Sequence, residues 1–176
     1  LTMPEVRSDA KTFRDTPRGE VKKLIYSPWH EVRMLGWIIL SQRLKNLKES
    51  SPAREETIET LFQFSMENKA QLNNWDLIDV NVPTLMGIWF FEHRGEKSGQ
   101  TLLKQWTSSK NLWDRRISVL STFYSLKKGY FEDLAWICEA LLDDSQDLIH
   151  KATGWMLQKK RKIDERFLKE FLKKHA

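Results

Sequence analysis

The sequence has few of the residues that interrupt helices. Seven Gly and five Pro are spread over 176 residues, and most of them lie where a helical pattern begins or ends. No segment alternates apolar and polar residues in the way that a half-buried strand does. The chain therefore predicts an all-α fold of about eight or nine helices joined by short loops.

The sequence has a single cysteine, which excludes an internal disulfide. Cys138 shares an apolar stripe with Leu134 and Leu141, so we expect it to pack in the core of a protein from a reducing compartment.

Several other classes of protein are excluded by what is missing. No Gly-rich loop could hold a nucleotide phosphate, and no apolar run is long enough to span a membrane, the longest covering residues 82–91. The first residues do not form a signal peptide. The four histidines lack the spacing of metal ligands: His30, His93, His150 and His175. We therefore expect a cytoplasmic protein without a metal or another cofactor.

The charge of the chain is basic. Lys and Arg number 29 against 24 acidic residues, a net charge of +5, which favours a polyanionic partner. The basic residues cluster in residues 104–128 and 159–174. The alternative for each cluster is a solvated helix face without a ligand.

Two distant segments repeat a pattern. Residues 33–40 (RMLGWIIL) and 151–158 (KATGWMLQ) both read basic-x-x-Gly-Trp, and residues 116–123 (RISVLSTF) keep the basic start. Arg33 and Lys151 lie 118 residues apart, which divides into three steps of about 39, within the range of HEAT repeats. We predict one domain over residues 1–176, an α-solenoid of HEAT-like antiparallel helix pairs with a concave basic face.

Aromatic and basic residues share faces in these repeated helices. Trp29, Arg33 and Trp37 follow the spacing i, i+4, i+8, as do Lys151, Trp155 and Lys159. For Trp29 and Trp37 we favour a place in the core. Trp155 has lysines on either side along its stripe, and such a basic groove with an exposed indole suits nucleic acid.

The glycines of the repeated pattern, Gly36 and Gly154, fall inside predicted helices. A glycine costs a helix about 1 kcal/mol relative to alanine. We therefore expect both glycines to mark places where two helices pack closely.

The segment NNWDLIDV, residues 73–80, places an indole beside two carboxylates. If it is helical, Trp75 and Asp79 lie on one face. A structural interpretation is open: Asn73 or Asn74 caps the helix, Asp76 favours its first turn, and Trp75 packs beneath.

Five segments, taken in order, resemble the AlkD-like DNA alkylation-repair glycosylases. They are HEVRMLGWIIL, NNWDLIDV, SSKNLWDRRISVLSTF, LIHKATGWMLQ and FLKEFLKKHA. The resemblance covers nearly the whole chain. It implies a HEAT-like solenoid that holds duplex DNA and hydrolyses the N-glycosidic bond of cationic alkylated purines, chiefly 7-methylguanine and 3-methyladenine.

The same resemblance implies roles for individual residues. Trp75, Asp79 and Trp155 are expected to contact the deoxyribose of the lesion, with Asp79 as the catalytic carboxylate, and Arg116 is expected at the DNA backbone. Further phosphate contacts are predicted for the remaining basic residues of the motifs: Lys151, Arg115, Lys159 and Arg33.

The sequence departs from the family in two places. It begins near MPEVRSDAK, residues 3–11, where relatives carry a further N-terminal helical segment, so we expect that segment to be missing. Relatives often place two adjacent Trp before the acid, and here the pair is Asn74-Trp75.

Two alternatives to the glycosylase stay open. One is a non-catalytic HEAT-like scaffold that binds nucleic acid or protein, and the other is a DNA-binding relative that has lost its activity. We expect a monomer, associated with the nucleoid when it is bound to DNA, and no strand-cleaving lyase step, because nothing requires a lysine nucleophile.

Overall fold

The computed structural model describes residues 2–161, 165, 169, 171, 173 and 174 of the chain, with the backbone alone at 160 and 161. Part of the basic cluster in residues 159–174 and part of the motif FLKEFLKKHA lie outside the described residues.

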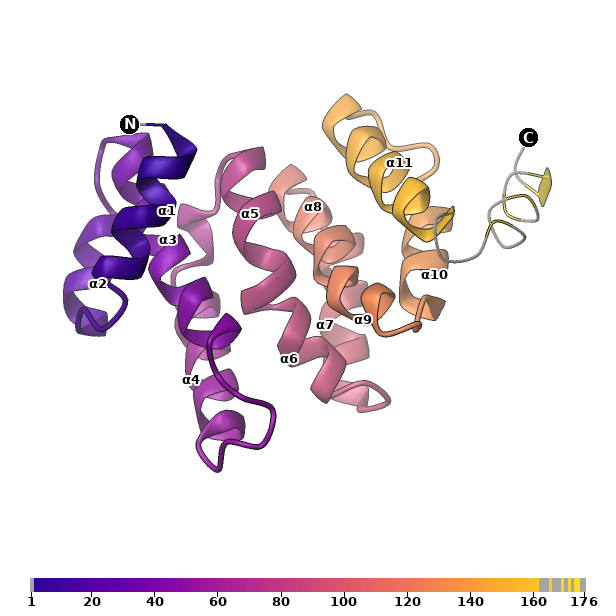
Figure 1. Ribbon diagram of the computed structural model, residues 1–176. Helices are drawn as coiled ribbons and strands as arrows, with labels where there is room; N and C mark the ends of the chain where they lie inside the picture. Colours follow the sequence, from indigo (N-terminus) through magenta and orange to yellow (C-terminus); the bar gives the residue numbers. More distant parts are fainter. Residues whose placement is uncertain (1, 162–164, 166–168, 170, 172, 175–176) are drawn as a thin grey trace. The chain divides into compact units, whose positions relative to one another are not determined.

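The protein is all-α, as the sequence predicts (Figure 1). Helices account for all regular structure in the described part of the chain: α1 (Met3–Thr12), α2 (Arg18–Ile25), α3 (His30–Lys45), α4 (Arg54–Glu67), a 3₁₀ helix (Lys69–Gln71), α5 (Trp75–Leu85), α6 (Gly87–Glu92), α7 (Lys97–Thr107), α8 (Leu112–Ser121), α9 (Phe123–Lys127), α10 (Glu132–Ala140) and α11 (Asp147–Arg161). The described helices outnumber the prediction because two predicted helices are divided, α5 from α6 and α8 from α9, by a single residue each.

The chain packs as two compact units, unit 1 over Leu1–Trp89 and unit 2 over Phe90–Ala176. Each unit is built around one helix. The prediction of a single HEAT-like solenoid domain stays a prediction.

In unit 1 the central helix is α3, which contacts α1, α2, α4 and α5. Its middle, from Gly36 to Ser41, is buried all round, which explains why this stretch is apolar without helical periodicity. A Cβ atom added at Gly36 would lie 2.6 Å from Ile25 Cγ2 and 3.1 Å from the backbone nitrogen of Ile25. The prediction that Gly36 marks close helix packing is confirmed, and the partner is α2.

Helix α5 lies beside α3 and runs in the same direction. In the core the Ser41 hydroxyl donates to Oδ1 of Asn81 at 3.0 Å, and the Asn81 amide donates to the carbonyl of Leu77. At the start of both helices His30 contacts Asp76. Two polar contacts in the same order along both helices fix the position of α5 on α3.

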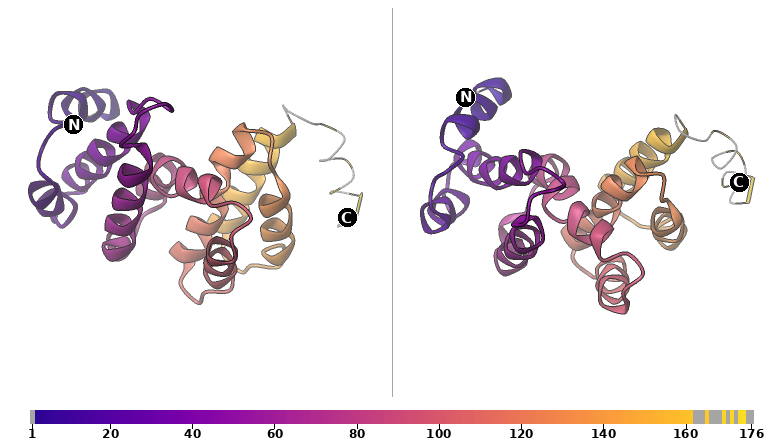
Figure 2. Two further views of the ribbon diagram at one scale, coloured as in Figure 1. Left: turned by 90° about the horizontal axis from the view of Figure 1, so that it is seen from below. Right: turned by 60° about the horizontal axis from the view of Figure 1, so that its bottom comes forward.

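In unit 2 the central helix is α8, which contacts α7, α9, α10 and α11. Residues from Arg116 to Ser121 are buried without a break. Helices α8 and α11 lie side by side in all the views of Figures 1 and 2. The apolar side of α11, with Ile149, Ala152 and Met156, packs into this core.

Two predictions about these helices are wrong. Trp29 is 71% exposed rather than in the core, although Trp37 is buried as predicted. Gly154 has no heavy atom within 4 Å of an added Cβ, so it marks no close helix packing. The buried position predicted for Cys138 is confirmed, and burial raises the pKa of its thiol to about 12.

Candidate functional site

The first turn of α5 presents an indole and a carboxylate on one face. Trp75 is the first residue of the helix and is 52% exposed, and Asp79 follows one turn later with a half-buried side chain. Asn74 is the N-cap residue, but its side chain makes no cap hydrogen bond. Asp79 is therefore neither sealed in the core nor used as a helix cap.

A proline lies four residues after the acid. Pro83 is inside α5 and has no N–H to donate to the backbone carbonyl of Asp79. The usual helical hydrogen bond to the carbonyl of Asp79 is therefore absent.

Asp76, on the same helix, is held by contacts within the protein. Its Oδ2 lies 2.6 Å from His30 Nε2, and its Oδ1 accepts from the backbone N–H of Leu77 at 2.7 Å. The other ring nitrogen of His30, Nδ1, lies 3.4 Å from Arg33 Nη2. Because a guanidinium can only donate, Nδ1 accepts and Nε2 carries the proton that is donated to Asp76. The structural interpretation of Asp76 holds, with a histidine as its partner.

Helix α11 carries the second cluster of predicted site residues. Trp155 is 37% exposed and stacks on Phe123 with ring centroids 5.3 Å apart and an interplanar angle of 12°. Lys159 Nζ lies 5.2 Å from the Trp155 ring centroid, and Lys127 Nζ lies 4.8 Å from that of Phe123. Two stacked rings, each with an ammonium group close to it, form an aromatic and cationic surface on unit 2.

Lys151 lies on α11 one turn before Trp155 and is exposed. It pairs with Asp147 at 2.6 Å, and both side chains are more than half exposed. Such a pair is weak in water, so Lys151 can exchange its partner for a phosphate at little cost.

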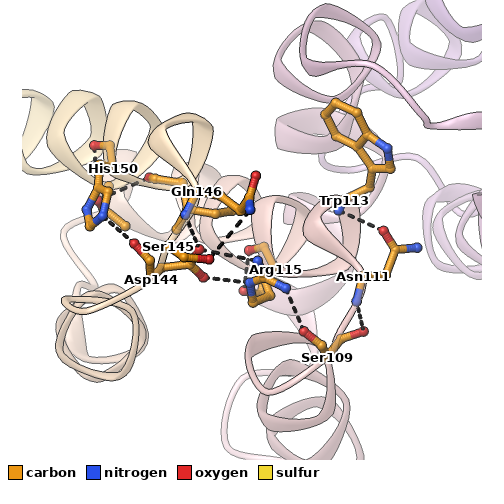
Figure 3. A network of polar contacts seen from close by, with 11 residues as sticks. Ser109, Asn111, Trp113, Arg115, Asp144, Ser145, Gln146 and His150 are labelled. Carbon is orange, nitrogen blue, oxygen red and sulfur yellow. Dashed lines mark hydrogen bonds and ion pairs between the residues drawn. The ribbon is translucent and has the colours of Figure 1, made fainter.

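Arg115 is held within unit 2 (Figure 3). Its guanidinium makes a two-point contact with Asp144, Nε to Oδ2 at 2.6 Å and Nη2 to Oδ1 at 3.2 Å, while Nη1 donates to the Ser109 carbonyl at 2.8 Å. The Arg115 and Asp144 side chains are only 13% and 6% exposed. This network ties the loop before α11 to α8, a role that the sequence did not predict, and the phosphate contact of Arg115 stays a prediction.

Arg116 is also turned inward. The residue is 4% exposed, and Nη1 donates to the backbone carbonyl of Leu148 in the first turn of α11. Arg115 and Arg116 together position α11, and with it Trp155 and Lys151. A direct phosphate contact of Arg116 stays a prediction that its burial does not favour.

The electrostatics of Asp144 follow from this network. Burial by itself would raise the pKa of the carboxyl group, but the hydrogen bonds from Arg115 and from the backbone N–H of Gln146 outweigh it. The charges of Arg115 and His150 act in the same direction. The pKa of Asp144 is thus held below its ordinary value.

Phe123, beside the predicted residues of unit 2, and His30, beside those of unit 1, were not predicted from the sequence. Phe123 could have been found, because Phe123 and Lys127 repeat the spacing of Trp155 and Lys159, an aromatic residue followed by lysine at i+4. His30 gave no local signal, since its partner lies 46 residues away.

The described residues include no group of three or more His, Cys, Asp or Glu side chains that could hold a metal ion. Among the same residues no helix is long and apolar enough to cross a membrane.

Comparisons with known proteins agree with the resemblance. No curated protein sequence matches the chain. A solved structure described as "Predicted DNA alkylation repair enzyme from Enterococcus faecalis" is similar to it, with a TM-score of 0.72 and 18% sequence identity over 99% of this chain and 79% of that one. The family described as DNA alkylation repair enzyme matches residues 1–176. The chain therefore belongs to the DNA alkylation repair enzyme family.

Proposed function

We propose that the protein is a monomeric DNA glycosylase that releases cationic alkylated purines, 7-methylguanine and 3-methyladenine, from duplex DNA. The proposal is carried by one observation, the exposed Trp75 and the half-buried Asp79 one turn apart on α5, in a chain of the DNA alkylation repair family. It involves neither a metal nor another cofactor.

In this reaction the deoxyribose, rather than the leaving base, needs stabilisation. A purine with a fixed positive charge leaves as a neutral base, so no proton donor is needed. As the glycosidic bond lengthens, positive charge moves to the deoxyribose and gives an oxocarbenium-like transition state, which a carboxylate stabilises. Asp79 supplies that carboxylate and orients the attacking water. Trp75 presents its indole face to the same cationic sugar, an attraction of about 0.5–2 kcal/mol.

The surface around Trp155 holds the DNA in this proposal. Lys151 and Lys159 neutralise phosphates, and the Trp155 ring, supported by Phe123, packs against a sugar of the duplex. Arg33 is a further phosphate ligand from unit 1. Arg115 and Arg116 contribute through the position of α11.

The experiment is base release from methylated duplex DNA. Native protein should liberate free 7-methylguanine, measured by chromatography under single-turnover conditions. Asp79→Asn should lower the rate by about 100- to 1000-fold, the usual effect of removing one preorganised electrostatic group, while duplex binding stays within about twofold.

Asp76→Asn is the matched control, because it makes the same substitution three residues away on α5. Its amide oxygen can still accept from His30, so release should stay within about threefold of native. A full-rate Asp79→Asn protein would remove Asp79 from the mechanism. Native protein that binds the duplex but releases no base would instead favour the inactive DNA-binding relative.

A further inference from the structure

Trp29 is the most exposed of the large hydrophobic side chains in the described part of the chain, at 71%. It is the N-cap residue of α3, a position that favours Ser, Thr, Asp or Asn. Its side chain supplies no cap, and its backbone N–H is already satisfied by the Ser27 hydroxyl at 3.1 Å. Neither the core nor the helix start therefore gives this indole a function.

A tertiary contact brings Trp29 to the α5 site. Trp29 directly precedes His30, and Trp75 directly precedes Asp76. The 2.6 Å contact between His30 and Asp76 therefore joins the two residues that follow the two exposed indoles. Both indoles lie at the N-terminal ends of neighbouring helices that run in the same direction.

The His30–Asp76 contact acts as a brace. Its side chains are about one-third and one-quarter exposed, at 32% and 27%, so it lies at the surface between the two helix starts rather than in the core. Arg33 extends the brace by its contact with His30, and Leu77 N–H fixes the other end on Asp76. A brace anchored at both ends holds the N-terminal ends of α3 and α5 together, and with them the backbone positions of Trp29 and Trp75.

We propose that Trp29 is a second DNA-contacting indole of unit 1, which packs on a deoxyribose or base of the duplex next to the nucleotide that Trp75 contacts. The His30–Asp76 brace is a positioning device that sets the distance between the two rings. The inference rests on the proposed function for the identity of the ligand, duplex DNA, and adds a binding residue from α3 that the family resemblance does not supply.

The chemistry favours nucleic acid over another occupant of this surface. An indole face packs on sugars and bases without regard to sequence, as a repair enzyme that searches duplex DNA requires. The neighbouring Arg33 adds a positive charge, and the family to which the chain belongs acts on DNA. Asp79 follows Trp75 one turn later on α5, and the His30–Asp76 contact joins the start of that helix to the residue after Trp29.

The test measures affinity for a labelled unmodified duplex, which does not depend on base release. Trp29→Ala should weaken binding by about five- to hundredfold, the range expected for loss of a stacked aromatic contact with nucleic acid. Trp29→Phe should recover most of the affinity. Phe13→Ala is the matched control, because Phe13 is another exposed aromatic of unit 1, at 55%, without an assigned role, and its removal should leave affinity unchanged.

The salt dependence of DNA affinity distinguishes a contact made by the Trp29 ring from a contact made by a charged side chain. Each phosphate contact adds about 0.9 to the slope of log K against log salt concentration. Trp29→Ala should keep the native slope while affinity falls, whereas Lys151→Ala should reduce it by about 0.9. Circular dichroism of Trp29→Ala should match that of native protein, because the side chain is exposed.

The brace is tested with Asp76→Ala against Asp76→Asn. The alanine variant loses the acceptor for His30 and should lose affinity about as much as Trp29→Ala, while the asparagine variant keeps an acceptor and should bind as native protein does. Trp29→Ala protein that binds the duplex within twofold of native would overturn the proposal. Native protein that binds DNA through Trp29 but releases no 7-methylguanine would overturn the proposed glycosylase and leave this inference standing.

Discussion

Arg115 and Asp144 form a buried two-point contact that fixes the loop before α11 to the start of α8. The two bonds measure 2.6 Å and 3.2 Å, and the Asp144 side chain is 6% exposed. Because α11 carries Lys151 and Trp155, this contact determines where those two side chains stand on unit 2.

Arg115→Ala should destabilise the protein. It leaves the Asp144 carboxylate buried without its guanidinium, which typically costs about 3–5 kcal/mol. Denaturant unfolding followed by circular dichroism measures the loss. Lys151→Ala is the control, because its pair with Asp147 is exposed and its removal should change the free energy of unfolding by less than about 1 kcal/mol. Equal losses for both variants would contradict the structural role of Arg115.

The same pair predicts acid sensitivity. The pKa of Asp144 is lower in the folded protein than the ordinary value of about 3.9 that it has in the unfolded chain. Its contribution to stability is therefore complete above the unfolded pKa and is lost as the pH falls from there through the lowered folded pKa. Thermal unfolding between neutral pH and pH 2 should show this loss in native protein and a smaller one in Arg115→Ala. Parallel pH profiles would contradict the assignment.

The two motif glycines should respond oppositely to alanine. In Gly36→Ala the new Cβ meets Ile25 Cγ2 at 2.6 Å and the backbone at 3.1 Å, so we expect a loss of about 1–3 kcal/mol from overpacking. Gly154→Ala meets nothing within 4 Å and should gain about 1 kcal/mol from helix propensity. The midpoint of urea unfolding should be lower than that of native protein for Gly36→Ala and higher for Gly154→Ala. A stabilised Gly36→Ala protein would mean that α2 moves easily away from α3.

Phe123→Leu should weaken DNA binding through Trp155. It removes the ring on which Trp155 stacks but keeps apolar bulk, and a stacked pair is worth about 0.5–1.5 kcal/mol, so affinity should fall about two- to tenfold. The control is Tyr124→Leu, a neighbouring aromatic residue whose ring packs against Phe91 instead, at a centroid distance of 5.3 Å. Fluorescence anisotropy with a labelled duplex measures both affinities, and equal effects would argue against a specific role of Phe123.

Local pattern in the sequence determined the fold class and much of the α5 site. Helical spacing of apolar residues, with few glycines and prolines, is sufficient to predict helices, because backbone hydrogen bonds in a helix are local. The spacing of Trp75 and Asp79 likewise places both on one face of α5 without knowledge of any neighbour. The ordered motifs also identified the family that the comparison then showed.

Tertiary packing decided which face of each helix is covered. Trp29 and Trp37 share a stripe, yet one is exposed and the other buried, because Trp29 is the N-cap residue before α3 whereas Trp37 lies in the middle of α3, which is buried all round. Arg115 and Arg116 read as phosphate ligands until their partners, Asp144 and Leu148, 29 and 32 residues later, are brought beside them. Periodicity states which residues share a face, but the neighbour that covers the face is supplied by a distant part of the chain, and only the folded structure determines it.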